Sequence, residues 1–251
     1  MEANKMMNDE TKRKLREMNL NEMIQMIDQQ EDTTTLSMPF DERFQYIVDF
    51  VYQEKYNSKV QGLIKRAKFR IPNADVTSLY YDNRDIDRNV MQELSTCQFI
   101  HRHTNVIFAG FTGSGKTFCA CALGKQACKY GIRSRYVRIP DLLIERDEAS
   151  LQTRGVIKLL NKYANYGVLI LDEWLLDTLS EQDIHFLFEL VERRYDSGST
   201  IYCTQFGKQD WHTRLGGGVH ADAMMDRIVH NAVWFETGNM NMREYQVKYN
   251  L

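Results

Sequence analysis

The sequence lacks any long apolar run. None of its hydrophobic stretches approaches the ~18 residues that a membrane-spanning helix needs. Its opening, residues 1–10, is polar and mixed in charge, without the apolar segment of a signal peptide. These two absences exclude a membrane protein and argue against secretion. We therefore expect a cytoplasmic protein with no membrane partner.

Cysteine is also scarce. The 251 residues include five cysteines, an odd number, and no two of them form a C-x-x-C pair. This pattern predicts reduced thiols that pack in a core, rather than a disulfide framework. Residues 1–96 contain neither cysteine nor histidine. A zinc-binding module is therefore excluded from that part of the chain, because zinc sites are built mainly from these two residue types.

Charge of one sign is not in excess either. The chain carries 32 Lys and Arg against 34 Asp and Glu, a formal net charge of −2. Such a chain has no overall attraction to nucleic-acid phosphate, so any DNA binding has to come from local basic patches. A hydrophobic content of 43% with 26% charged residues is typical of a globular enzyme.

Among the features that are present, residues 110–117 have the G-x-x-x-x-G-K-[ST] pattern of a phosphate-binding loop. An apolar segment over residues 105–109 predicts a strand before the loop, and residues 117–130 predict a helix after it. In this setting Lys116 would contact the β- and γ-phosphates of ATP, and the Thr117 hydroxyl would bind Mg²⁺. Backbone N–H groups of the loop would turn toward phosphate oxygens. The predicted cofactor-binding residues are Gly110, Thr112, Gly113, Ser114, Gly115, Lys116 and Thr117.

A second motif consists of four apolar residues, 168–171, followed by Asp172 and Glu173. It predicts a buried parallel strand whose carboxyl end brings both carboxylates beside the phosphate loop. Asp172 would hold Mg²⁺ through the water shell of the ion, and Glu173 would polarise the water that attacks the γ-phosphate. The alternative is that the two acids only begin a solvated turn before the next helix.

The chain up to residue 70 has helical apolar spacing. It predicts a domain of three or so amphipathic helices, too small to be very stable alone. We expect this domain to dock on the rest of the chain or on a neighbouring subunit. Its apolar stripes are formed by Leu15, Met18, Met23, Met26 and Ile27, by Phe44, Ile47, Val48 and Val51, and by Val60, Leu63, Ile64 and Ala67.

Residues 71–100 are a predicted linker that ends in a helix over residues 86–100. Its place in the chain puts it where the base of a bound nucleotide would lie, and a plain connector is an equally good interpretation. Residues 101–251 alternate strands with helices, which predicts an α/β domain with a parallel sheet covered by helices on both faces.

The last strand predicted in this domain covers residues 200–204. Thr204 or Gln205, at its end, would sense the γ-phosphate or help to place water. Either residue is equally well explained as an ordinary strand-end cap. Two further strands are predicted at residues 135–139 and 168–171.

With these motifs in place, the sequence resembles the IstB-like transposition helper ATPases, relatives of the DnaC and DnaI helicase loaders in the AAA+ superfamily. The resemblance covers nearly the whole chain, and it implies a P-loop AAA+ fold. The residues that carry it lie in segments 39–44, 63–69, 110–117, 169–173, 192–195 and 221–232, of which the last is the most specific.

The resemblance implies two further arginines in the ATP site. Arg227 would be an arginine finger donated to the site of the adjacent subunit, and Arg243 resembles a sensor-II arginine. An arginine supplied in trans couples hydrolysis to assembly, so the resemblance implies a homo-oligomer. A surface salt bridge is the alternative for each arginine. Because only eight residues follow Arg243, we expect no sizeable C-terminal lid.

Two departures from the family pattern stand out. Trp174 follows the acidic pair where relatives have a smaller residue, and three glycines at residues 216–218 are expected to loosen the loop before the finger helix.

Binding to double-stranded DNA follows from the resemblance and from three local groups of cations. For any one group taken alone, a solvated face is the favoured interpretation over a DNA-binding groove. In an oligomer each weak patch would repeat along the duplex and give non-specific, salt-sensitive binding. The candidate DNA contacts are Lys65, Arg66 and Lys68, then Arg133, Arg135 and Arg138, then Lys158 and Lys162.

The resemblance implies an ATP-dependent DNA-binding regulator of an insertion-sequence transposase, associated with the nucleoid. Its subunits would assemble on duplex DNA with ATP and Mg²⁺, prepare the target and recruit the cognate transposase. A replicative helicase loader is the leading alternative. A phosphotransferase is a third reading, and Glu173 and the Arg227 helix argue against it.

Overall fold

The computed structural model describes residues 7–29, 37–238 and 240–249. Contacts within the chain divide it into two compact units, the first ending at Gly62 and the second beginning at Leu63. The division falls inside helix α4 (Phe40–Ala67), so one continuous helix contributes residues to both units. The domain boundary near residue 70 stays a prediction.

The first unit contains α1 (Asp9–Glu17), α2 (Asn21–Gln29) and most of α4. Leu15 and Ile24 are buried in one hydrophobic cluster, and Met23 and Ile27 pack against this cluster. The two stripes predicted at residues 44–51 and 60–67 belong to a single helix of 28 residues. In contrast, the stripe predicted from residue 15 to 27 is divided between two helices, because Asn19 has a left-handed backbone (φ 56°).

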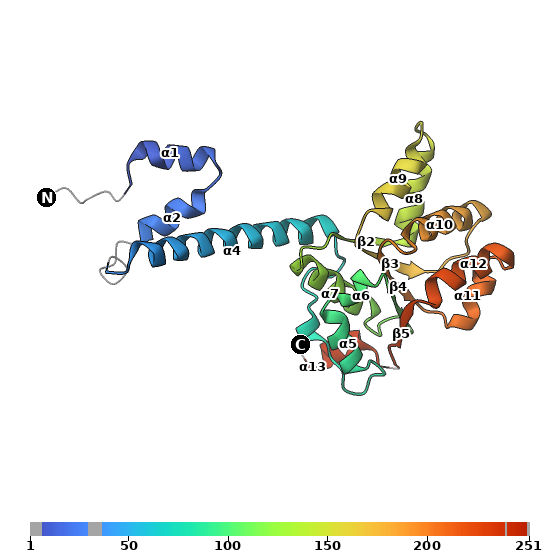
Figure 1. Cartoon of the computed structure of the whole chain (residues 1–251). Helices are drawn as coiled ribbons and strands as arrows, with labels where there is room; N and C mark the ends of the chain where they lie inside the picture. The colour runs from blue at the N-terminus through green and yellow to red at the C-terminus, as the bar shows by residue number, and fades with distance from the viewer. Residues whose placement is uncertain (1–6, 30–36, 239, 250–251) are drawn as a thin grey trace. The chain divides into compact units, whose positions relative to one another are not determined.

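The second unit is built on a five-stranded sheet with the strand order β2-β3-β4-β1-β5 (Figure 1). Every neighbouring pair is parallel, which confirms the predicted α/β class. Strands β1, β2 and β4 match the predictions to within one residue at both ends, and β3 runs three residues beyond its predicted end. The strands are β1 (Asn105–Ala109), β2 (Ser134–Arg138), β3 (Val168–Trp174), β4 (Ser199–Thr204) and β5 (Ala232–Glu236).

Helices cover both faces of this sheet (Figure 1). Alternation along β1 shows the two layers, because Val106 and Phe108 pack into one core cluster and Ile107 into the other. The first layer holds η1 (Val76–Ser78), α5 (Arg88–Ser95), α6 (Gln98–His101) and α7 (Lys116–Lys129). The second holds α8 (Ile139–Ser150), α9 (Gly155–Ala164), α10 (Glu181–Arg194), α11 (Lys208–Arg214) and α12 (Gly218–Val229).

Helix α13 (Met242–Tyr249) follows β5. Of the helices that the structure describes, none combines the length and the apolarity that crossing a bilayer requires.

The segment predicted as a linker, residues 71–100, is packed into the first core layer. Met91 and Leu94 are buried, and Asp75 is hydrogen-bonded to Lys129 of α7 at 2.7 Å. The helix predicted over residues 86–100 is two helices, α5 and α6, separated at Cys97 by a left-handed backbone (φ 63°). All five cysteines are free and buried, as predicted.

Arg194, at the end of α10, ties three elements of the second unit together. Its side chain is buried, and burial lowers the pKa of this guanidinium to about 10. Nε donates to the Thr200 hydroxyl at 2.8 Å, and Nη2 donates to the Ser199 carbonyl at 2.6 Å. Nη1 donates to the carbonyls of Tyr163, Ala164 and Tyr166. One side chain thus provides hydrogen-bond donors for backbone carbonyls at and after the end of α9 and at the start of β4.

We predict that Arg194→Met lowers the free energy of unfolding by about 3 kcal/mol, because it leaves several buried carbonyls without a donor. Urea unfolding followed by circular dichroism measures the change. Arg193→Met is the matched control, since the neighbouring arginine lies on the surface and bonds to Asn161 at 2.6 Å. A loss of less than 1 kcal/mol in Arg194→Met, or equal losses in both variants, would refute this role.

Candidate functional site

The predicted phosphate loop connects the end of β1 to the start of α7, in the expected order of strand, loop and helix. Gly113 and Gly115 have φ values of 92° and 88°, which other residues adopt only with strain. The N–H of Gly110 donates to the Thr204 carbonyl at 3.2 Å and fixes the start of the loop to β4. Thr112 is exposed at the tip of the loop.

The hydroxyl of Ser114 has a structural partner that the sequence did not suggest. It lies 2.6 Å from the hydroxyl of Thr237, which follows β5. Both side chains are fully buried. A side chain in place of Gly110 would overlap Thr237. Thr237 therefore holds the base of the loop, and no sequence signal identified it because it lies 123 residues from Ser114.

Lys116 reaches back across the loop. Its Nζ donates to the carbonyls of Gly110 at 2.6 Å and Phe111 at 2.7 Å. Burial lowers the pKa of Lys116, and the nearby charge of Arg243 lowers it further against the opposing effect of Asp172. The ammonium is therefore held over the loop by two uncharged carbonyls, which the charged phosphate oxygens of a bound nucleotide can replace.

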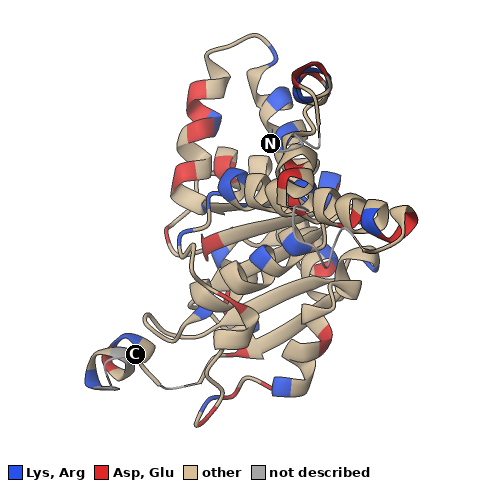
Figure 2. Cartoon of the chain, turned by 90° about the vertical axis from the view of Figure 1, so that its left-hand side faces the viewer, with Lys and Arg blue, Asp and Glu red and all other residues tan. Residues whose placement is uncertain are grey.

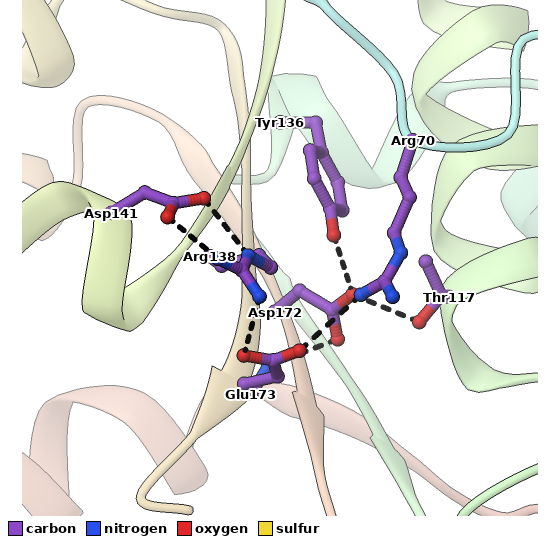
Figure 3. A network of polar contacts seen from close by, with 7 residues as sticks. All are labelled: Arg70, Thr117, Tyr136, Arg138, Asp141, Asp172 and Glu173. Carbon is purple, nitrogen blue, oxygen red and sulfur yellow. Dashed lines mark hydrogen bonds and ion pairs between the residues drawn. The ribbon is translucent and has the colours of Figure 1, made fainter.

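Thr117 and Asp172 meet at the carboxyl edge of the sheet, where a Mg²⁺ ion was predicted (Figure 3). The Thr117 hydroxyl donates to Asp172 Oδ2 at 2.9 Å, and the Tyr136 hydroxyl donates to the same oxygen at 2.7 Å. Burial, followed by the charge of Asp172, raises the pKa of Tyr136, so this phenol stays a donor. In the part of the chain that the structure describes, no group of three acidic, cysteine or histidine side chains could hold a metal by itself.

This donor set fits Mg²⁺. The ion takes one or two protein oxygens and completes its shell with water and substrate phosphates, and Thr117 and Asp172 offer one hydroxyl and one carboxylate.

Strand β3 carries a bulge between Leu171 and Trp174, where its pairing with β4 shifts register. Glu173 lies in the bulge with a left-handed backbone (φ 59°). Trp174 is fully buried and packs on Tyr202, with ring centroids 4.9 Å apart. The bulge therefore turns Trp174 into the core and Glu173 out of it, which explains the large residue after the acidic pair.

Two arginines flank Glu173 (Figure 3). Arg70 Nη1 lies 3.3 Å from Glu173 Oε1, and Arg138 Nη1 lies 3.5 Å from Oε2. Arg138 is also bonded to Asp141 through two nitrogens, at 2.7 and 2.9 Å. A hydrogen bond with Tyr136 raises the pKa of Arg70, against burial. From the sequence, Arg70 is only the last residue of a basic run, and nothing there signals its contact with Glu173, 103 residues away.

The predicted linker and the C-terminal helix both lie against the phosphate loop. Arg84 donates from Nη2 to the Ser114 carbonyl, and the N–H of Met242 donates to the Gly113 carbonyl at 2.9 Å. The rings of Tyr80 and Tyr245 lie 4.8 Å apart. Arg243, in the first turn of α13, is close enough to Lys116 for its charge to act on that residue.

The two candidates for the γ-phosphate sensor differ in their surroundings. Thr204 is buried, donates to the Trp174 carbonyl at 3.0 Å and accepts from the N–H of Phe206 at 3.2 Å. Gln205 is exposed at the end of β4. The hydroxyl of Thr204 is thus committed to holding the bulge, and Gln205 is the freer of the two side chains.

Arg227 is not part of this chain's own phosphate site. It forms an ion pair with Glu192 and lies 5.9 Å from the ring centroids of Phe188 and Tyr195. Its carbonyl accepts from Asn105 Nδ2, at the beginning of β1. The phosphate loop follows the other end of that strand, so the Arg227 guanidinium is remote from it.

The three predicted basic patches differ in what they offer to DNA. Lys65, Arg66 and Lys68 are exposed at and after the end of α4, and Arg133, Lys158 and Lys162 are exposed as well. The prediction for Arg135 is wrong, because this side chain is buried and donates to the Arg66 carbonyl at 3.3 Å. Arg138 is committed to Asp141 and Glu173. Figure 2 shows acidic residues interspersed among the basic ones along the helices.

A parallel sheet with a phosphate loop after one strand and an acidic pair at the end of another defines a nucleotide-binding protein of the P-loop class. The model of the family described as IstB-like ATP binding protein matches residues 13–249, and the chain belongs to this family.

Relatives with assigned names agree with this membership. A Sinorhizobium fredii protein named for an insertion sequence and for ATP binding is 33% identical over 190 residues, which are 74% of this chain and 75% of the relative. A Pseudomonas fluorescens protein named for insertion sequence IS1162 and for ATP binding is 32% identical over 202 residues, covering 80% of this chain and 87% of the relative.

Solved structures share the fold. The DnaC helicase loader superposes with a TM-score of 0.54 at 22% identity, over 65% of this chain and 97% of that one. DnaI superposes with a TM-score of 0.54 at 18% identity, over 68% of this chain and 91% of that one. At these identities the likeness extends to the architecture alone.

We predict that Lys116→Ala weakens ATP binding by about tenfold to a hundredfold, because charge-assisted hydrogen bonds to phosphate are lost. Titration with a fluorescent ATP analogue measures the dissociation constant. Lys125→Ala is the control, since Lys125 lies on the same helix and pairs with Asp75 at 3.7 Å. Unchanged affinity in Lys116→Ala would contradict a nucleotide site at this loop.

Proposed function

We propose that this protein is an ATP-dependent, DNA-binding regulator of insertion-sequence transposition. The observation that carries the proposal is the convergence of Lys116, Thr117, Asp172 and Glu173 at one edge of the sheet, in a member of the IstB-like family. Binding alone requires only the first three residues. Glu173 beside them supports hydrolysis of ATP to ADP and phosphate.

Each residue has a distinct task in the proposed reaction. Lys116 exchanges its two carbonyl partners for the β- and γ-phosphates, while loop N–H groups bind the remaining oxygens. Thr117 and Asp172 would hold Mg²⁺, and the ion would supply positive charge against the charge that develops on the phosphates. Glu173 orients a water and accepts its proton as the water attacks the γ-phosphate. Gln205 and Arg243 contact the γ-phosphate from β4 and α13.

Arg227 completes the site of a neighbouring copy in this proposal. Its distance from its own phosphate loop supports a role in trans, since a guanidinium must reach the γ-phosphate to stabilise the transition state. Hydrolysis then requires two correctly joined subunits. The pair with Glu192 holds Arg227 until a neighbour's nucleotide replaces the carboxylate.

Duplex DNA and a transposase are the proposed partners. The relatives' names associate the family with insertion sequences, and exposed cations at Lys65, Arg66 and Lys68 supply a local patch on a chain of net charge −2. In an oligomer such a patch repeats along the backbone of the duplex. A helicase loader is the second candidate, supported by the likeness to DnaC and DnaI.

We predict that Glu173→Gln lowers the turnover of ATP by about a hundredfold or more, because the amide cannot accept the proton of the attacking water. ATP binding and ATP-dependent assembly on DNA persist. Phosphate release assays measure turnover, and electron microscopy of the variant with plasmid DNA shows assembly. Turnover at the wild-type rate would exclude Glu173 as the base.

We predict that Arg227→Ala lowers the DNA-stimulated turnover of ATP about a thousandfold. A mixture of Arg227→Ala with Lys116→Ala recovers activity, because the second variant donates Arg227 to the intact loop of the first. Arg193→Ala is the control on the facing helix. Full activity of Arg227→Ala alone, or no recovery in mixed assemblies, would show that the finger does not act between subunits.

A further inference from the structure

Glu173 has a guanidinium on each of its carboxylate oxygens. Arg70 contacts Oε1 at 3.3 Å and Arg138 contacts Oε2 at 3.5 Å. The Glu173 side chain is 23% exposed, so both contacts lie at the rim of the site. A carboxylate in this arrangement is drawn toward cations on both sides and is not free to turn toward a water at the γ-phosphate.

The two arginines are anchored differently. Arg138 is the last residue of β2 and is bonded to Asp141 by two hydrogen bonds, so the positive charge of Arg138 is shared between Asp141 and Glu173. Among the residues that the structure describes, Glu173 is the acid that pairs directly with Arg70, and the charge of Asp172 acts on Arg70 as well. The shorter of the two contacts to Glu173 is made by Arg70, which forms no second ion pair in the described part of the chain.

The backbone that presents Arg70 is held in place. Ala67, at the end of α4, is fully buried, and Phe69 is 7% exposed in the core layer beside α7. Lys68, between them, turns the chain with a left-handed backbone (φ 54°). This turn aims Arg70 at the carboxyl edge of the sheet, while its side chain remains 47% exposed and free to leave.

Through Tyr136, Arg70 is also linked to the metal-binding carboxylate. The Tyr136 hydroxyl, which raises the pKa of Arg70, donates to Asp172 Oδ2 at 2.7 Å. Arg70 thus contacts Glu173 directly and Asp172 through one intermediate. It forms no hydrogen bond or ion pair with the phosphate loop or with Lys116 in the part of the chain that the structure describes.

We propose that Arg70 is a positioning residue that restrains Glu173 and keeps ATP hydrolysis slow until the Arg70 side chain leaves the carboxylate. The inference rests on the proposed role of Glu173 in hydrolysis and adds a regulatory residue to that site. The restraint acts on the chemical step. Because Arg70 does not contact the nucleotide loop, nucleotide affinity is independent of it.

The test is the single-turnover rate of ATP hydrolysis without DNA, with protein in excess over labelled ATP. Arg70→Gln raises this rate about threefold to tenfold, the effect expected when a partly exposed ion pair is removed from the base. The dissociation constant for ATP stays within about twofold of the wild-type value. Arg70→Lys gives an intermediate rate, since it keeps the charge and loses the planar fork.

Arg102→Gln is the matched control. It removes one positive charge from the same unit, and the Arg102 side chain is exposed and lies outside the proposed ATP and DNA sites. Its rate without DNA equals that of the wild type. Thermal unfolding of each variant checks that the fold is retained, and the Arg70→Lys rate provides a second reading if Arg70→Gln is destabilised.

The outcomes separate this inference from the proposed function. If the wild type does not hydrolyse ATP, or if Glu173→Gln hydrolyses it normally, both are wrong. If Glu173→Gln abolishes hydrolysis while Arg70→Gln leaves the single-turnover rate unchanged or lowers it, only the restraint is wrong. An equal rise in Arg102→Gln would attribute the effect to general charge and would also overturn the restraint.

Discussion

The hydrogen bonds that converge on Asp172 Oδ2 are the constraint on which the site depends. One buried oxygen accepts from Thr117 in α7 and from Tyr136 in β2. These contacts fix the helix after the phosphate loop, the second strand and the acidic strand relative to one another. A buried carboxylate is stable only when donors surround it. The same hydrogen bonds therefore pack the three elements together and hold a metal ligand in position.

The bulge in β3 separates two demands that a regular strand would bring into conflict. In a strand, neighbouring side chains alternate between the two covered faces. Here Asp172 has to face the loop, and Trp174 has to fill the core beside Tyr202. Glu173, between them, has a left-handed backbone, so its side chain lies on neither face. The strain of that conformation, about 1–2 kcal/mol, is offset by the burial of a tryptophan and by ion pairs to Glu173.

Local patterns predicted much of this molecule, and the limits of the prediction follow from the range of the interactions. The loop from Gly110 to Thr117 and the strand before Asp172 are contiguous motifs, and the structure places them as predicted. Strand β5 was not predicted, because it is a short run whose residues are mostly half-buried. Thr237, Arg70 and the burial of Arg135 depend on partners far away in sequence, and nothing in their immediate neighbours signals those contacts.

Strand β1 has the phosphate loop after one end and the carbonyl of Arg227 bonded at the other. A subunit of the proposed assembly therefore accepts a neighbour's arginine at one end of this strand and donates its own Arg227 from the opposite end. Copies arranged this way join head to tail, and a single two-fold dimer cannot satisfy both ends at once. Such an assembly has a polarity. Unless it closes into a ring, one terminal subunit always holds a nucleotide that no neighbour can complete.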